Sequence, residues 1–151
     1  MSDTNATDDA RSAVATPRIR QVVLDAPDAR QLAEFYRQLF GLHYRAGDEP
    51  PAAGEDDPNG ADWLVLRGAA DGFGLAFQHV PDLPVPTWPD GPRPQMLHLD
   101  TTVPNVAELA VQRQRALDLG ATELLDRSDD EDEPLFVLAD PAGHPFCIFV
   151  G

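Results

Sequence analysis

The sequence contains no lysine and only one cysteine. All 11 of its basic residues are arginine, whereas 26 residues are acidic, so the formal net charge is -15. Proteins that bind nucleic acid neutralise its phosphates with Lys and Arg, and this charge balance therefore argues against a nucleic-acid partner. The single Cys147 cannot form an internal disulfide, which fits a reducing compartment.

A hydrophobic run long enough to span a membrane is also missing, so we expect no membrane partner. The N-terminal segment MSDTNATDDARSAVATPR has neither a basic start nor an apolar middle, which predicts a cytoplasmic protein. We expect residues 1–17 to form a disordered acidic tail. The remaining residues, 18–151, contain enough hydrophobic side chains for one core and are predicted to form a single domain.

Much of the acidic charge lies in two stretches rich in turn-forming residues, GDEPPAAGEDDPNG at 47–60 and SDDEDEP at 128–134. Proline and glycine exclude regular structure there. One interpretation is that both stretches are solvated loops that keep the protein soluble. The other is that they form an acidic rim that attracts a cationic ligand.

Two parts of the chain show the same order of predicted elements. In the first, an alternating strand at 19–26 precedes a helix that begins at Asp28 and ends at Gly41, and short apolar strands follow. In the second, a strand at 95–103 precedes a helix that begins after Pro104-Asn105, and three more strands follow. The repeat predicts an α+β fold of two tandem β-α-β-β-β modules, about 19–80 and 95–150, joined by a proline-rich connector at 81–94.

The repeat assigns partners to His98. Placing Pro27-Asp28 on Pro104-Asn105 also places Gln21 on His98, so the first strands of the two modules carry these residues at equivalent points. Placing Asp71-Gly72 on Ala142-Gly143 matches Ala76 with Cys147 in the last strands. The four equivalent positions are Gln21, Ala76, His98 and Cys147.

The sequence resembles the vicinal oxygen chelate superfamily, which includes glyoxalase I, bleomycin-resistance proteins and extradiol dioxygenases. The resemblance extends over residues 19–150 and rests on the paired modules, on EFYRQLFG after the first strand and on DPAGHPFCIF at the end of the chain. The segment LAFQHVPDLPVPTWPDGPRPQMLHLD resembles a glyoxalase-like subgroup of high-GC actinobacteria. The resemblance implies two modules side by side, sheets that form a concave, cup-like cavity, and a homodimer.

In metal-dependent members of the superfamily, the first and last strands of each module supply the ligands. The resemblance assigns this role to Gln21, Ala76, His98 and Cys147, but a carboxylate is expected where Ala76 and Cys147 stand. Hard divalent cations need oxygen donors, so we expect no metal cofactor. A divalent metal, if present, would be held by Gln21, His98 and Cys147; alternatively, Cys147 is a small apolar residue of a buried strand.

Strand alternation predicts which side chains line the cup. Two functions remain open. The first is binding of a small aromatic or cationic molecule, in the manner of bleomycin resistance and without the usual metal. The second is a metal-dependent lyase, isomerase or dioxygenase with a rearranged metal site. For both functions the predicted pocket residues are Gln21, Val23, Asp25, Ala76, Gln78, His98, Asp100, Cys147 and Phe149.

Overall fold

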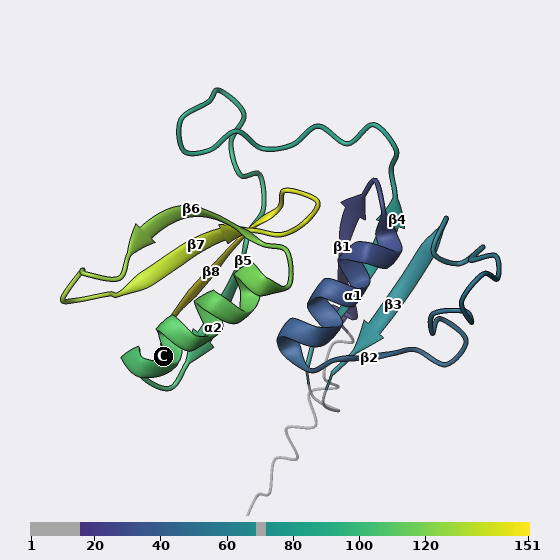
Figure 1. Ribbon diagram of the computed structural model, residues 1–151, viewed down its shortest axis with the longest axis horizontal. Coiled ribbons are helices and arrows are strands. Elements are labelled where there is room, and N and C mark those ends of the chain that lie inside the picture. Colours follow the sequence, from purple (N-terminus) through teal and green to yellow (C-terminus); the bar gives the residue numbers. More distant parts are fainter. Residues whose placement is uncertain (1–15, 69–71) are drawn as a thin grey trace, which may run out of the picture.

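A computed structural model describes residues 16–68 and 72–151 and contains two β-α-β-β-β modules (Figure 1). The predicted α+β class and its tandem modules are confirmed. The predicted tail at 1–17 falls mainly on residues outside the described ones. The first module consists of β1 (Gln21–Ala26), α1 (Ala29–Phe40), β2 (His43–Tyr44), β3 (Trp63–Arg67) and β4 (Gly74–His79). The second consists of β5 (Leu99–Val103), α2 (Val106–Asp118), β6 (Thr122–Arg127), β7 (Leu135–Ala139) and β8 (Pro145–Val150).

Each module forms its own four-stranded sheet with the same topology. The strand orders are β1-β4-β3-β2 and β5-β8-β7-β6. In each sheet the first and last strands of the module pair in parallel, and the other pairs are antiparallel. The crossover that parallel pairing requires is supplied by α1 in the first module and by α2 in the second.

Both helices begin at the residues that the sequence indicates. The Asp28 side chain accepts a hydrogen bond from the Gln31 amide at 2.9 Å, and the Asn105 side chain accepts one from Glu108 at 2.9 Å. These caps satisfy amide groups that have no partner within the helix. Gly41 ends α1 with a φ of 65°, a left-handed conformation that glycine adopts without steric cost.

One hydrophobic core joins the two modules through α1. The ring of Tyr36 is fully buried, stacked 6.0 Å from Phe77 of β4 and edge-on at 6.2 Å from Phe146 of β8. Phe35, the neighbouring residue, also meets Phe146 edge-on at 6.0 Å. Aromatic pairs in these geometries are favourable beyond the area they bury, so α1 fixes the second sheet as well as its own.

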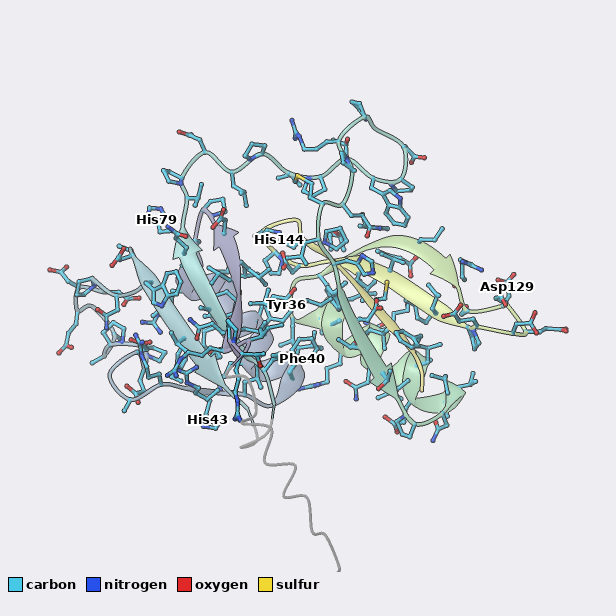
Figure 2. All side chains as sticks on the ribbon, turned by 180° about the vertical axis from the view of Figure 1, so that it is seen from behind. Tyr36, Phe40, His43, His79, Asp129 and His144 are labelled. Carbon is cyan, nitrogen blue, oxygen red and sulfur yellow. The ribbon has the colours of Figure 1, made fainter. Side chains whose placement is uncertain are left out.

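The two helices lie on the same side of the two sheets. Figure 1 shows α1 and α2 in front of the strands, and Figure 2, drawn from behind, shows the strands in front of the helices. In β3, Leu64 and Leu66 belong to the core beneath α1, so strand alternation turns Val65 to the opposite face. Each sheet therefore has one face covered by a helix and one helix-free face.

The structure differs from the sequence prediction at the start of β5. The strand begins at Leu99 and not at residue 95, because Met96 has a φ of 65° that interrupts extended backbone. His98 consequently precedes the strand and does not lie within it. No helix within residues 16–68 and 72–151 has both the length and the apolar character that crossing a bilayer requires.

The acidic stretch at 47–60 forms no helix or strand, as predicted, but two of its carboxylates are not merely solvated. Asp48 is 4% exposed and accepts a hydrogen bond from the Val65 amide at 3.0 Å. Asp57 accepts two hydrogen bonds from the Arg30 guanidinium, at 2.8 and 2.9 Å. The solvated-loop interpretation is therefore wrong for these two residues, which attach the loop to β3 and α1.

Candidate functional site

Three of the predicted pocket residues meet on the helix-free face of the second sheet. Asp100 and Cys147 are direct partners in the parallel pairing of β5 with β8. The His98 side chain lies on the same side, with Nε2 3.1 Å from Asp100 Oδ1. One donor atom from each of the three residues lies within 4.8 Å of the other two. We call His98, Asp100 and Cys147 the β5–β8 cluster.

The environment of the β5–β8 cluster keeps Cys147 protonated. Burial, followed by the negative charge of Asp100, raises the pKa of the Cys147 thiol to about 11. The thiolate is the nucleophilic form of cysteine, so Cys147 is a weak nucleophile at neutral pH. The side chains of His98 and Asp100 are 43% and 60% exposed, which leaves both accessible to a ligand.

The first module carries a different polar group at the equivalent place. Gln21, at the start of β1, accepts a hydrogen bond through Oε1 from Arg67 Nη1 at 3.1 Å. The sequence interpretation missed Arg67. The alternation of β3 was a usable signal, because Leu64 and Leu66 are buried beneath α1 and Arg67 therefore falls on the helix-free face.

The other predicted residues of the first module follow along β1 and β4 on the same face. Ala76 is fully buried and is paired with Val23 of β1 and Val65 of β3. Val23 is 38% exposed, an unusual state for a valine in the middle of a strand. Gln78 is exposed and Asp25 is half-buried. In the second module Phe149 is half-buried.

The four positions that the superfamily uses for its metal do not fit a divalent cation here. Ala76 has no donor atom. The Gln21 oxygen already accepts a hydrogen bond from a guanidinium, whose positive charge would repel a metal ion at that oxygen. Within residues 16–68 and 72–151, only the β5–β8 cluster, with one nitrogen, one oxygen and one sulfur donor, has a composition that suits a borderline-soft ion such as zinc.

Three cavities lie away from the predicted pocket. The first, of about 310 Å³, is lined by the end of α1, by β5 and by α2, and includes Phe40 and Arg115. The second, of about 380 Å³, lies beside Tyr44, and the third, of about 320 Å³, lies between the connector and the β7–β8 turn. None of the three is lined by any of the nine predicted residues; of those nine, Val23, Gln78, His98 and Asp100 are exposed and Ala76 is fully buried.

A second polar group lies at the junction of the modules, where Figure 2 labels Tyr36 and His144 between the two sheets. The Tyr36 hydroxyl donates to Asp140 Oδ2 at 2.7 Å, and Asp140 Oδ1 accepts from the amides of Ala142 and His144 at 2.9 and 3.0 Å. His144 Nε2 lies 2.6 Å from the carbonyl oxygen of Asp25. Burial raises the pKa of the Tyr36 hydroxyl and of the Asp140 carboxyl.

This junction joins the two short motifs on which the resemblance rests. Tyr36 belongs to EFYRQLFG and Asp140 to DPAGHPFCIF, and their side chains are hydrogen-bonded to each other across the two modules. His144 precedes β8, and its ring contacts β1 rather than the β5–β8 cluster. The histidines are not gathered in one site: Figure 2 places His43 and His79 on the first module, apart from His144.

Comparison with protein families matches residues 21–149 to the glyoxalase-like domain. A comparison with curated proteins gave no match. Similar solved structures include a glyoxalase/bleomycin resistance protein/dioxygenase family enzyme from Burkholderia phytofirmans, with 15% identity, a TM-score of 0.63, and coverage of 89% of this chain and 98% of that one.

Two further structures have more specific descriptions. A fosfomycin resistance protein from Listeria monocytogenes, complexed with Mn(II) and a dihydroxypropylphosphonic acid, shares 15% identity with a TM-score of 0.64 over 91% of this chain and 94% of that one. A lactoylglutathione lyase from Agrobacterium tumefaciens shares 18% identity with a TM-score of 0.56 over 90% and 95%. At these identities the structures establish the fold alone, and the actinobacterial subgroup stays a prediction. The family match over residues 21–149, together with the shared fold, shows that the chain belongs to the glyoxalase-like domain family of the vicinal oxygen chelate superfamily.

Proposed function

We propose that the helix-free faces of the two sheets bind a small organic molecule, and that they do so without the usual catalytic metal of the superfamily. One observation carries the proposal. Both helix-free faces turn to the same side of the molecule (Figure 2), and the residues on them combine exposed apolar surface with a few polar groups. Small-molecule sites have this composition, in which apolar contacts supply affinity and a few polar groups fix orientation.

The chemistry of these faces favours a ligand with an apolar or aromatic body. Val23 is 38% exposed, and Trp63 and Phe149 are half-buried and available for packing. His98 supplies a hydrogen-bond donor or acceptor, and Asp100 supplies a carboxylate that attracts a cationic group. The net charge of -15 adds a long-range field that concentrates cations near the surface.

We also propose that the protein works as a cytoplasmic homodimer. Four of the nine predicted residues, Val23, Gln78, His98 and Asp100, are exposed in one chain, and none of the three cavities includes any of the nine. A second copy placed against the helix-free faces would exclude water and turn this surface into a cup. Dimerisation is common in the superfamily, and it would bury exposed apolar side chains such as Val23, Met96 and Leu97.

A second candidate function is a metal-dependent lyase, isomerase or dioxygenase, and the β5–β8 cluster favours it. Its three donor atoms lie within 4.8 Å of one another, and catalytic zinc sites keep three protein ligands with a fourth position open. One similar structure contains Mn(II) and another is described as a lyase. The exposure of the His98 and Asp100 side chains weighs against this candidate.

The proposal is tested by mapping ligand contacts with nuclear magnetic resonance. Benzylamine is a suitable probe because it combines an aromatic ring with a cationic group. We expect its chemical-shift changes to centre on His98, Asp100 and Val23. His98→Ala should weaken binding about tenfold, which corresponds to about 1.4 kcal/mol. His79→Ala is the matched control, because His79 is exposed and strand alternation in β4 places it on the helix side with Phe77, and it should leave binding unchanged.

Shifts confined to the helix side, around Phe40 and Arg115, would contradict the proposed function. Equal affinity of wild-type protein and the His98→Ala variant would also contradict it. The second candidate function predicts a different result, namely that binding of the probe depends on added zinc.

A further inference from the structure

We propose that Arg67 is the anchor for a carboxylate group on the ligand. The inference rests on the proposed function, because it assigns a chemical class to the molecule that the helix-free faces bind. The sequence interpretation considered only aromatic and cationic ligands. Arg67 adds a positive group to the same surface, so a molecule that also carries a carboxylate fits this surface better than one that carries a cationic group alone.

The strand pattern brings Arg67 to the helix-free face of the first sheet. In β3, Leu64 and Leu66 are fully buried in the core beneath α1. Alternation therefore places Trp63, Val65 and Arg67 on the other face. The Arg67 side chain is half-buried, so it lies against the sheet and does not extend into solvent.

Gly74 allows the guanidinium to cross the neighbouring strand. A Cβ atom at residue 74 would lie 3.2 Å from Arg67 Nη1 and 2.8 Å from the carbonyl oxygen of Leu66. A real side chain at this position would therefore displace both groups. Because β4 lies between β3 and β1, the missing side chain opens a path from Arg67 to Gln21 on the far strand.

The hydrogen bond between Arg67 and Gln21 holds the guanidinium in place. It uses one of the five N–H donors of the guanidinium and leaves the amide nitrogen of Gln21 outside this contact. The two side chains together therefore present several N–H donors on one surface. A planar guanidinium binds a carboxylate through two parallel hydrogen bonds, which is a stronger arrangement than a bond to a neutral amide.

Arg67 differs from the arginines of this acidic chain that are paired with carboxylates. Arg30, Arg37 and Arg113 form ion pairs with carboxylates at 2.8, 2.9 and 2.6 Å. Among residues 16–68 and 72–151, Arg67 forms no ion pair and its hydrogen bond goes to a neutral amide. Arg93 and Arg115 also form no ion pair among the described residues, but both donate to backbone carbonyl oxygens. A half-buried guanidinium has lost part of its hydration, and a carboxylate from a ligand would restore charge-assisted hydrogen bonds.

The net charge of the chain favours a carboxylate over phosphate. With a net charge of -15, the long-range field of the protein repels anions. Inorganic phosphate carries nearly two negative charges at neutral pH, so this repulsion is about twice as strong for phosphate as for a carboxylate with one charge. A monoanion bound by Arg67 keeps the local attraction at the smaller long-range cost. We therefore expect a carboxylate to bind more tightly than inorganic phosphate.

Nuclear magnetic resonance on the full-length protein tests the inference with benzoate as the probe. Benzamide is the uncharged control of the same shape, and inorganic phosphate is the alternative anion. At constant ionic strength, benzoate should shift the Arg67 Nε–H signal and the amide signals of Gln21 and Gly74. Benzamide should leave the Arg67 Nε–H signal in place. Phosphate should bind more weakly than benzoate.

Arg67→Gln, which keeps hydrogen-bonding ability but removes the charge, should weaken benzoate binding at least tenfold. Arg67→Lys should restore part of the affinity, and Arg127→Gln is the matched control on the exposed strand β6 and should have no effect. The inference is overturned if Arg67→Gln binds benzoate as tightly as wild type, or if benzoate does not shift the Arg67 Nε–H signal. It is also overturned if benzamide shifts the same signals, or if phosphate binds more tightly than benzoate. In each of these cases benzylamine binding at His98 reports separately on the proposed function.

Discussion

Tyr36→Phe should destabilise the protein by loosening the junction between the two modules. The Tyr36 ring is fully buried and Asp140 is 4% exposed, so water does not readily replace the lost hydroxyl. The hydroxyl donates to Asp140 Oδ2 at 2.7 Å, whereas Oδ1 keeps its two backbone donors. A hydrogen bond to a charged group contributes about 1.5–3 kcal/mol, and we expect a loss of about 2 kcal/mol because phenylalanine preserves the ring packing.

Urea denaturation at pH 7 measures this loss. For a domain of this size, about 2 kcal/mol corresponds to a fall in Tm of roughly 4–8 °C. Tyr44→Phe is the matched control: its hydroxyl donates to Glu34 at the same distance of 2.7 Å, but the contact is only part-buried, and we expect a cost below about 1 kcal/mol. A loss below about 0.5 kcal/mol for Tyr36→Phe, or an equal loss in both variants, would refute the reasoning.

The Asp140 carboxyl also gives this junction a pH dependence. Burial raises its pKa in the folded protein above the ordinary value of 3.8, so the folded state binds this proton more tightly than the unfolded chain does. The associated stability is present below pH 3.8 and is lost as the pH rises through the folded pKa. Asp140→Asn should remove this decline, and a variant that retains the wild-type slope above pH 4 would contradict the assignment.

Three further predictions concern other parts of the molecule. The Arg30 guanidinium lowers the pKa of the Asp57 carboxyl, so the stability from this ion pair is present above the unfolded pKa of Asp57 and is lost as the pH falls. In urea titrations, Asp57→Asn should cost about 1 kcal/mol at pH 7 and almost nothing near pH 2. A cost that does not change with pH would contradict this prediction. Because the pKa of Cys147 is raised to about 11, iodoacetamide should alkylate it at pH 8 roughly 100-fold more slowly than an unperturbed thiol, and a rate like that of free cysteine would refute the raised pKa. Light scattering should give twice the chain mass of 16.4 kDa, whereas a monomer at all concentrations would remove the proposed homodimer.

The sequence predicted the repeated architecture because its signals are local. The capping residues Asp28 and Asn105 and the left-handed Gly41 determine where the helices begin and end without reference to the rest of the chain. The repeat also grouped His98 with Cys147, and the donor atoms of His98, Asp100 and Cys147 lie within 4.8 Å of one another although His98 precedes β5.

Features that depend on contacts between strands could not be read in the same way. The contact of Arg67 with Gln21 requires the order β3-β4-β1 and a glycine at the crossing point, and the alternation of one strand does not reveal the strand order. The start of β5 was misplaced because the left-handed conformation of Met96 is rare for a residue other than glycine. The hydrogen bond from Tyr36 to Asp140 joins residues 104 positions apart, beyond the reach of any local pattern.

The central claim, that this protein binds an organic molecule without the usual metal of its superfamily, is tested most directly by elemental mass spectrometry. Protein purified without a metal-affinity tag should contain well under one equivalent of manganese, iron, nickel or zinc. The reason is that Ala76 offers no donor and the Gln21 oxygen accepts a hydrogen bond from the Arg67 guanidinium. One equivalent of metal per chain, lost in the His98→Ala variant, would contradict the account and favour a metal-dependent enzyme built on the β5–β8 cluster.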